Sequence, residues 1–491
     1  MAAFEAQAQT PRKGGVLRIS VDQAVAKLNP LVTRVNPEYM VSELLYSALT
    51  RLRVDMSVEP DLAQSWTSTA DLLEWTFILR QGVTFHDGSP CTASDVVATF
   101  EAILDPKTAS PARQNVGPIA KVTAKNDATV VFTLSAPFAD LPVTLAYTNA
   151  KVIPASVIKS GLTRLDSAAI GTGPFKLVSY EGDRKIIVER NPAYYDKGRP
   201  YLDRIEIVVY PDSTAEGSAL ISGDTDMIST APPTEFARLQ KAKGVKALRV
   251  PSGQFCNVNF GCDQKPFNDV RVRQAMNMAV NRDAIVEILL HGATVTANQP
   301  AGRYVLGYDP GAPPYPYDPA KARALLASAG HPDGFRFTLE TAGNGAAALS
   351  VYQQVAADLK KVGVTMEIRT VPVPQFFRDV LHTGDTADAI TLSWISAPSL
   401  DVLPAIRVHS CLQQQPWYCD PDVTPLYTAA VSEFDDAKGL ALRRQISLRY
   451  HDQAPALFLY EQVLFAGLSK RVSGFEDVYG FISYDKLDIR D

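Results

Sequence analysis

The stretch that decides the fold runs from Asp61 to Pro106 and reads DLAQSWTSTADLLEWTFILRQGVTFHDGSPCTASDVVATFEAILDP. Residues 75–85 alternate apolar and polar side chains, which predicts a strand with one buried face. A turn follows at Asp87 and Gly88, and the next residues have the spacing of an amphipathic helix. The stretch therefore predicts strands and a helix that share one core.

Two residues at the end of this strand, His86 and Asp87, could form half of an active site. Adjacent residues on a strand point to opposite faces, so they are poor candidates for a cooperating pair. Asp followed by Gly is also typical of a turn. We expect a structural role for both, and we expect Asp95 to stabilise the amino end of the following helix.

Composition and motifs limit the classes of function. Lys and Arg number 48 against 53 Asp and Glu, a formal net charge of -5, and no basic stripe suggests a nucleic-acid partner. No apolar run approaches the roughly 20 residues of a membrane span. The sequence has no Gly-x-Ser-x-Gly, His-Glu-x-x-His or phosphate-binding loop motif, and its six histidines lack metal-ligand spacing. We expect a protein that is not an enzyme and has no metal or cofactor.

The rest of the chain alternates strands and helices. Residues 171–250 predict an α/β arrangement, and GTGPF at 171–175 is expected to be a tight turn. Residues 251–261 resemble a strand with Asn257 and Asn259 on one face. Helical spacing runs through 269–290, 319–329 and 350–362, with strands between them at 335–342 and 365–373. A second α/β domain is therefore expected over 258–460.

The cysteines bear on the compartment. Cys411 and Cys419 bracket the loop CLQQQPWYC, which predicts a loop-closing disulfide and an oxidising environment. Two free thiols are the alternative, because spacing alone does not prove a bridge. The remaining Cys91, Cys256 and Cys262 leave an odd count. Near the start, Ala6-Gln7-Ala8 resembles the surroundings of a signal cleavage site, although the charged and apolar regions of a signal peptide are absent from residues 1–15.

Four ordered motifs carry a family resemblance. They are the opening stretch, then GTGPFKLVSYEGDRKIIVERNPAYYDKGRPYLDRIEI at 171–207, ISGDTDM at 221–227, and KPFNDVRVRQAMNMAVNRDAIV at 265–286. In this order the chain resembles the family 5 extracytoplasmic solute-binding proteins of ABC importers, which include oligopeptide, dipeptide and nickel receptors. The resemblance extends from about Gly14 to the C-terminus.

The resemblance implies an α/β, two-lobed periplasmic-binding-protein (type II) fold with an extra α/β subdomain inserted in the first lobe. The expected boundaries are 14–45 for the first lobe, 46–170 for the inserted subdomain, 171–255 for the first lobe again, 256–462 for the second lobe and 463–491 for the return to the first. Hinge closure around the ligand is implied, and we expect the hinge near 251–257 and 459–466.

In peptide-binding relatives a Trp is followed three residues later by an Asp that pairs with the α-ammonium of the ligand. The matching stretch, TLSWISAPSLDVLPAI, has Trp394 but places Ala397 at the Asp position. Because an unpaired buried ammonium costs several kcal/mol, a free-N-terminus peptide bound in the usual way is disfavoured. Asp401 could replace that carboxylate only if the loop runs differently.

The candidate ligand contacts combine a stacking face, short hydrogen-bond donors and anion anchors. They are Trp394, Ser396, Ser393, Phe255, Asn257, Asn36, Tyr39, Arg407 and Arg378. The structural alternatives are hinge packing for Phe255 and a solvated face for either Arg. His409, beside the cysteine loop, is expected to be a lone surface residue.

The predicted function is that of a monomeric periplasmic receptor. It would bind a peptide or peptide-like compound between two lobes, and an ABC permease would recognise the closed form. The alternatives are a sensor or receptor for an opine, sugar derivative or metal chelate on the same scaffold, and a hydrolytic offshoot.

Overall fold

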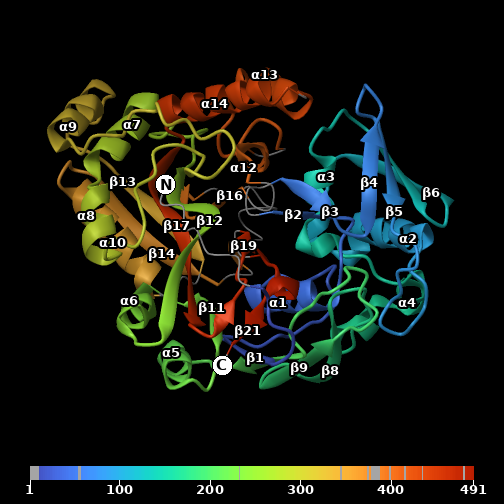
Figure 1. The fold of residues 1–491 in the computed structure, drawn as a ribbon. Coiled ribbons are helices and arrows are strands. Elements are labelled where there is room, and N and C mark those ends of the chain that lie inside the picture. Colours follow the sequence, from blue (N-terminus) through green and yellow to red (C-terminus); the bar gives the residue numbers. More distant parts are fainter. Residues whose placement is uncertain are drawn as a thin grey trace. The chain divides into compact units, whose positions relative to one another are not determined.

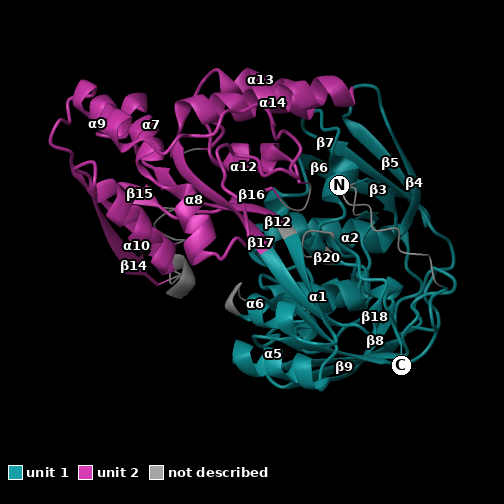
Figure 2. Cartoon of the chain, turned by 60° about the vertical axis from the view of Figure 1, so that its left-hand side comes forward, with its two compact units in different colours: residues 1–250, 464–491 teal, residues 251–463 magenta. Residues whose placement is uncertain are grey.

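The computed structural model describes residues 10–53, 57–231, 233–342, 346–372, 375–376, 387–396, 400–413, 416–433, 435–478 and 481–490. The chain divides into two compact units (Figure 2). Unit 1 comprises residues 1–250 and 464–491, and unit 2 comprises residues 251–463. The chain passes from one unit to the other within two long strands, β12 (Val245–Phe260) and β17 (Ala456–Ser469).

The main sheet of unit 1 has the strand order β17-β11-β1-β10-β9-β8. Strand β1 (Val16–Val21) lies parallel to both neighbours, β10 (Arg204–Val209) and β11 (Met227–Ala231). The hairpin of β8 (Phe175–Glu181) and β9 (Lys185–Arg190) extends the sheet in antiparallel fashion. The apolar alternation of β1 and β10 buries Leu17, Ile19, Ile205 and Ile207 completely. Helices α5 (Ser213–Ser222) and α6 (Pro233–Lys241) flank β11 (Figure 1).

The stretch from Asp61 to Pro106 contributes two strands to a separate antiparallel sheet in unit 1. Its order is β4-β5-β7-β6, with bounds Ala63–Ser68, Glu74–Leu79, Thr129–Leu134 and Ile119–Asn126. Helix α2 (Ala93–Leu104) packs against β6 and β7. It begins with a capping box in which the Thr92 amide donates to the Asp95 carboxylate at 2.8 Å. The predicted role of Asp95 at the amino end of this helix is confirmed.

The turn after β5 holds two segments of unit 1 together. The Asp87 carboxylate accepts from the amide of Ser89 at 2.9 Å, which closes the turn. The Nε2 of His86 lies 3.2 Å from the Gly173 carbonyl oxygen. Burial lowers the pKa of His86 to about 4, so the ring is neutral near neutral pH. The side chains of this turn therefore have the structural role that the sequence predicts.

Where a tight turn is expected at 171–175, the chain bends at Gly173 and Pro174 before β8 begins, and close packing there requires glycine. A Cβ atom on Gly171 would lie 2.0 Å from the carbonyl oxygen of Leu45, and one on Gly173 would lie 2.4 Å from the carbonyl carbon of Leu45. The glycines allow the chain to pass directly against the end of α1 (Asn36–Leu45).

Unit 2 has the strand order β14-β13-β15-β12-β17, and β16 also pairs with β12. The strand bounds are Thr365–Val371 for β14, Arg336–Ala342 for β13, Ala389–Ile390 for β15 and Trp394–Ile395 for β16. Strand β13 is parallel to β14 and β15, while β15 and β16 are antiparallel to β12. The helices are α7 Val270–Ala279, α8 Arg282–Ala284, α9 Pro319–Ser328, α10 Ala346–Lys360, α12 Val402–Val408, α13 Val423–Val431 and α14 Asp436–Gln453.

The helical spacing over 269–290 corresponds to two helices and a π-helical turn rather than to one continuous helix. Helix α7 ends at Ala279, and Val280 adopts an extended conformation. Asn281 then caps a new start, because its side chain accepts from the Ala284 amide at 3.0 Å. A π-helical turn, η5, covers Ile285–Leu289. The local capping strength of Asn overrides the helical spacing of the apolar residues.

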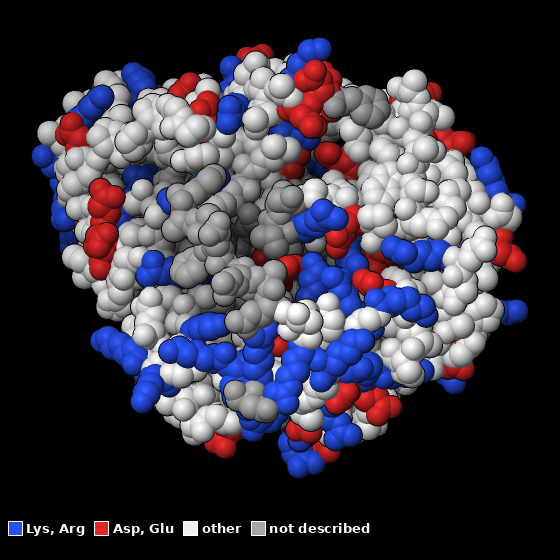
Figure 3. All heavy atoms as spheres, viewed as in Figure 1, with Lys and Arg blue, Asp and Glu red and all other residues white. Residues whose placement is uncertain are grey.

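The remaining elements of unit 1 are short. They are β2 Thr50–Leu52, β3 Val58–Pro60, η1 Pro106–Thr108, η2 Pro111–Gln114, α3 Leu141–Thr144, η3 Thr148–Ala150, α4 Ala155–Ser160, η4 Leu162–Asp166, β18 Val472–Ser473, β19 Asp477–Val478, β20 Phe481–Ile482, η7 Tyr484–Lys486 and β21 Asp488–Ile489. Within the described residues, none of the helices is both long and apolar enough to cross a bilayer. Figure 3 shows Lys and Arg gathered on the lower part of the visible face, mixed with Asp and Glu.

Candidate functional site

The sequence candidate Trp394 lies on the short strand β16. This strand pairs with β12, so that Trp394 is opposite Phe255 in the register. The indole Nε1 donates to Oδ1 of Asn259 at 2.6 Å, and Nδ2 of Asn259 donates to the Leu392 carbonyl at 2.8 Å. The side-chain amide of Asn257 lies 2.6 Å from the same Oδ1. Two asparagines and an indole therefore form one buried hydrogen-bonded group in unit 2.

The rings around Trp394 form an aromatic cluster. His409 stacks on the indole with ring centroids 4.2 Å apart and an interplanar angle of 5°. Phe255, Tyr450 and Phe458 complete the packing, at centroid distances of 5.8, 5.5 and 5.8 Å. Trp394 and Phe255 are each only 1% exposed. Protein side chains thus account for the packing of both residues, and a ligand contact by either stays a prediction.

The expectation that His409 is a surface residue is wrong. Helix α12 turns the chain so that His409, at the end of that helix, covers the indole face. Burial lowers the pKa of His409 to about 3, so the imidazole is neutral near neutral pH. The Tyr450 hydroxyl donates to the His409 carbonyl oxygen at 2.6 Å, which fixes the backbone at this point.

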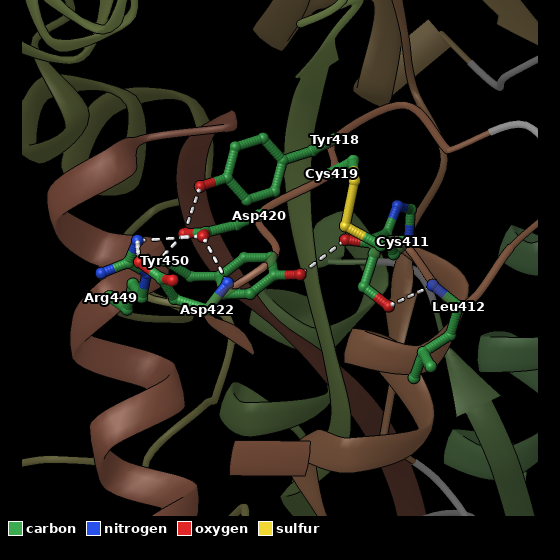
Figure 4. The surroundings of a disulfide bond; sticks show 10 residues. Cys411, Leu412, Tyr418, Cys419, Asp420, Asp422, Arg449 and Tyr450 are labelled. Carbon is green, nitrogen blue, oxygen red and sulfur yellow. Dashed lines mark hydrogen bonds and ion pairs between the residues drawn. A yellow bond between two sulfur atoms is a disulfide. The ribbon is translucent and has the colours of Figure 1, made fainter. Parts of the chain in front are cut away.

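The predicted disulfide between Cys411 and Cys419 is present. It joins the end of α12 to a loop that is anchored on α14 (Figure 4). In that loop the Asp420 carboxylate accepts from Tyr418 Oη at 3.1 Å and forms an ion pair with Arg449. The bridge therefore holds the segment carrying His409 against a charged network on the neighbouring helix.

Asp401 is engaged within the protein. Its Oδ1 accepts from the Leu403 amide at 2.9 Å and so caps α12. Its Oδ2 accepts from Nε of Arg443 at 2.7 Å, and both side chains are almost fully buried. This carboxylate is therefore committed to an internal ion pair, which does not favour it as the counterion for a ligand ammonium.

The other predicted ligand contacts of unit 2 are not part of the aromatic cluster around Trp394. Ser396 is fully buried and its amide donates to the Gly253 carbonyl at 3.2 Å. Ser393 is half-buried just before β16, and Arg407 is half-buried in the last turn of α12. Arg378 and Ala397 lie outside the described residues. Ligand roles for this set stay predictions.

Two candidates lie in unit 1, at the start of α1. Asn36 is the exposed first residue of the helix, and Tyr39 is half-buried one turn later. The residue before them, Val35, provides no side-chain cap. Both candidates therefore lie in the first turn of α1, directly after the loop that follows β1.

Sequence reasoning missed the partners that position the aromatic cluster. Asn259, His409 and Tyr450 were not among the predicted contacts, although each touches Trp394 in the structure. For Asn259 the signal was available, because it shares a strand face with Asn257. For His409 and Tyr450 no local pattern could predict the contact with Trp394, because His409 lies at the end of α12 and Tyr450 lies in α14.

The chain is similar to a known family and to several known proteins. Residues 57–406 match the family described as bacterial extracellular solute-binding proteins, family 5 Middle. The glutathione-binding protein GsiB of Pectobacterium atrosepticum is 28% identical over 472 residues, covering 93% of this chain and 90% of that protein. The structure of AgaA from A. tumefaciens in complex with agropinic acid matches with a TM-score of 0.82 and 26% identity, over 97% of this chain and 99% of that one. HbpA2 of Haemophilus parasuis matches in fold with a TM-score of 0.85 and 24% identity, over 97% and 100% of the two chains.

Proposed function

Because the chain belongs to family 5 of the bacterial extracellular solute-binding proteins, we propose that it receives a peptide or peptide-like solute and delivers it to an ABC importer. The observation that carries this proposal is the family match over residues 57–406, together with a similar relative that binds glutathione, a tripeptide. Members of the family are extracytoplasmic transport receptors. The finer expectations, a periplasmic location and a monomer, are part of the proposal.

The chemistry of unit 2 supports binding over catalysis. The described side chains around Trp394 are aromatic rings and amides, which suit stacking and hydrogen bonding. His409 is held neutral by burial, which suits packing better than proton transfer near neutral pH. These groups are expected to support a binding surface beside them rather than to react.

A non-peptide solute is the second candidate. AgaA, at 26% identity, is described in complex with agropinic acid, and the sequence alternative of an opine, sugar derivative or metal chelate rests on Ala397. The replacement of the expected Asp by Ala argues for a ligand whose ammonium, if present, is paired elsewhere.

We propose that the two crossings between the units act as the hinge. The unit boundaries fall at 250/251 within β12 and at 463/464 within β17, close to the segments 251–257 and 459–466 that the sequence suggests. Ligand affinity for one arrangement of the units over another would then shift the population that the permease recognises.

Native mass spectrometry of the purified protein, before and after denaturation, tests the proposed function. A released small molecule would identify the solute, and a thermal-shift panel of peptides, glutathione and organic acids covers the case of an empty protein. A ligand at about 100 times its Kd should stabilise the protein by about 2.7 kcal/mol. Slow consumption of a bound solute over hours, with a new product, would contradict the assignment as a receptor.

A further inference from the structure

Two segments that lie far apart in the sequence carry positive charge only. Residues 236–252 contain five Lys or Arg and residues 464–475 contain two, and neither segment contains an Asp or a Glu. The whole chain has the opposite balance, with 48 Lys and Arg against 53 Asp and Glu. The overall composition of the chain therefore does not account for this concentration of one sign of charge.

Two of the seven basic residues are held by neighbours on α6. The Nη2 of Arg238 pairs with Oε2 of Glu235 at 2.6 Å, and the guanidinium of Arg249 lies 5.3 Å from the centroid of the Phe236 ring. The other five are Lys241, Lys243, Lys246, Lys470 and Arg471, and all five are exposed. We call these five residues the basic end of unit 1.

The fold joins the two segments at one place in unit 1. The first segment runs from α6 into β12, and the second contains the end of β17 and the turn after it. The amide of Lys470 donates to the Gly244 carbonyl oxygen at 2.8 Å, and Lys243 and Lys246 lie within two residues of Gly244. In Figure 3, Lys and Arg gather around the part of the visible face where Figure 1 places α6 and β11. Tertiary contacts therefore assemble a basic surface that neither segment forms alone.

The nearby carboxylates leave the basic end with excess positive charge. The buried Asp226 is shared by two arginines, because its Oδ2 lies 3.0 Å from Nε of Arg18 and its Oδ1 lies 3.5 Å from Nη1 of Arg471. Asp224 accepts a hydrogen bond from the Ser222 hydroxyl at 2.7 Å. Within the described part of the chain, the four lysines of the basic end form no ion pair.

The basic end lies away from the edge at which open α/β sheets bind small ligands. Asp226 directly precedes β11, and its carbonyl oxygen accepts from the Ser469 amide at 2.8 Å. The basic end is therefore at the amino end of β11, whereas sheets of this kind bind ligands beyond the carboxyl ends of their strands. A partner on the basic end would leave that opposite edge of the sheet free.

The residue types indicate the kind of partner. A Lys ammonium is a hydrated point charge on a flexible stem, so exposed lysines suit a surface with many dispersed anionic groups better than one bidentate anion. Lys is also depleted in protein–protein interfaces, which disfavours an acidic protein as the partner. Membranes that contain anionic lipids attract clustered Lys and Arg through the negative potential at their surface.

We propose that the basic end of unit 1 is a docking surface for an anionic lipid bilayer. The lysines contact the headgroup region electrostatically, and no insertion into the apolar layer is required. Bilayer attraction would concentrate a receptor beside the membrane that holds its importer. That consequence rests on the proposed function, whereas the attraction itself does not depend on the solute.

Sedimentation with lipid vesicles tests this inference. The vesicles are phosphatidylcholine alone, or phosphatidylcholine with about 30% phosphatidylglycerol as the source of negative surface potential. The test variant replaces four lysines by Gln: Lys241, Lys243, Lys246 and Lys470. The matched control replaces four other exposed lysines by Gln, and so changes the net charge equally: Lys107, Lys121, Lys159 and Lys321. Equal thermal unfolding midpoints for the three proteins would establish that the variants fold.

We expect the wild-type protein to sediment with the anionic vesicles and to remain in solution with phosphatidylcholine alone. The bound fraction should fall as salt rises from about 20 mM to about 150 mM, because the shorter Debye length screens the attraction. Each lysine near the surface contributes about 5-fold to partitioning, so the test variant should bind about 100-fold or more weakly. The control variant should bind within about 5-fold of the wild-type protein, because its lysines lie outside the basic end.

Three results would overturn the inference. They are no binding of the wild-type protein to anionic vesicles at low salt, equal binding to both kinds of vesicle, and equal losses in the test and control variants. Binding to the importer in phosphatidylcholine that is lost in the test variant, without vesicle binding, would assign the basic end to a protein partner instead. Solute binding by a protein that ignores vesicles would contradict this inference alone. Vesicle binding by a protein that takes no solute would count against the proposed function.

Discussion

The stability of the protein should depend on pH through His409. This imidazole stacks on Trp394 and is only 3% exposed. Burial lowers its pKa in the folded protein from 6.5 to about 3. The unfolded chain therefore binds the proton more tightly, so the stabilising effect is fully present above about pH 6.5 and is lost as the pH falls towards about 3.

The size of the effect follows from these two pKa values. Between about pH 8 and about pH 5 the folded imidazole stays neutral, while the same group in the unfolded chain becomes charged. Proton linkage then lowers the free energy of unfolding by about 2 kcal/mol over this interval. His409→Phe keeps an aromatic ring against Trp394 but has no proton to bind, so it should lack this contribution.

Urea unfolding of the two proteins at several pH values measures the difference. Carboxylates and the other histidines contribute equally to the free energy of unfolding of both proteins. The change with pH in the difference between the two free energies therefore isolates His409. As the pH falls from about 8 to about 5, the wild-type protein should lose about 2 kcal/mol of unfolding free energy relative to the variant. His331→Gln, which removes a less buried histidine, is the control for losing any imidazole. A wild-type minus variant difference that stays constant across this range would refute the reasoning.

Three further changes have defined expectations. Replacing both Cys411 and Cys419 by Ser should lower the free energy of unfolding by about 2 to 3 kcal/mol, since a short closed loop is released, and chemical denaturation without reductant measures it. Asp401→Asn should cost about 3 to 5 kcal/mol because it leaves the buried Arg443 charge without its carboxylate; an unchanged denaturation midpoint would contradict the ion pair. Gly173→Ala should destabilise by at least about 1 to 3 kcal/mol through backbone overlap, and thermal unfolding as stable as wild type would show that the turn can relax.

Local sequence patterns were sufficient to predict caps and turns, because these depend on hydrogen bonds between residues close in sequence. The capping residues Thr92 and Asp95 and the turn at Asp87 could be recognised because side chain and backbone partner lie within three residues. The helical spacing of 269–290 did not show the break at Val280, because the competing cap at Asn281 is a single residue within an apolar repeat. The ordered motifs also carried the family, since all four lie in the same order within the matched residues 57–406.

The candidate site contains contacts that local patterns do not predict. Trp394 could be chosen from its motif, and Phe255, Asn257 and Asn259 from their strand, but the partners His409 and Tyr450 could not. The stacking of His409 and the bonding of Tyr450 depend on how α12 and α14 pack, which no periodicity encodes. A charged or aromatic residue looks the same in sequence whether it is solvated or buried.

The sequence by itself determined the fold class, the family and the local turns and caps, because these depend on periodicity, short-range hydrogen bonds and the order of long motifs. Only the tertiary structure decided which polar groups are already satisfied. It committed Asp401 to Arg443 and placed His409 on an indole face. The physical reason is that burial and pairing are set by contacts between residues far apart in the chain, and those contacts decide whether a charge stabilises the fold or remains available for a ligand.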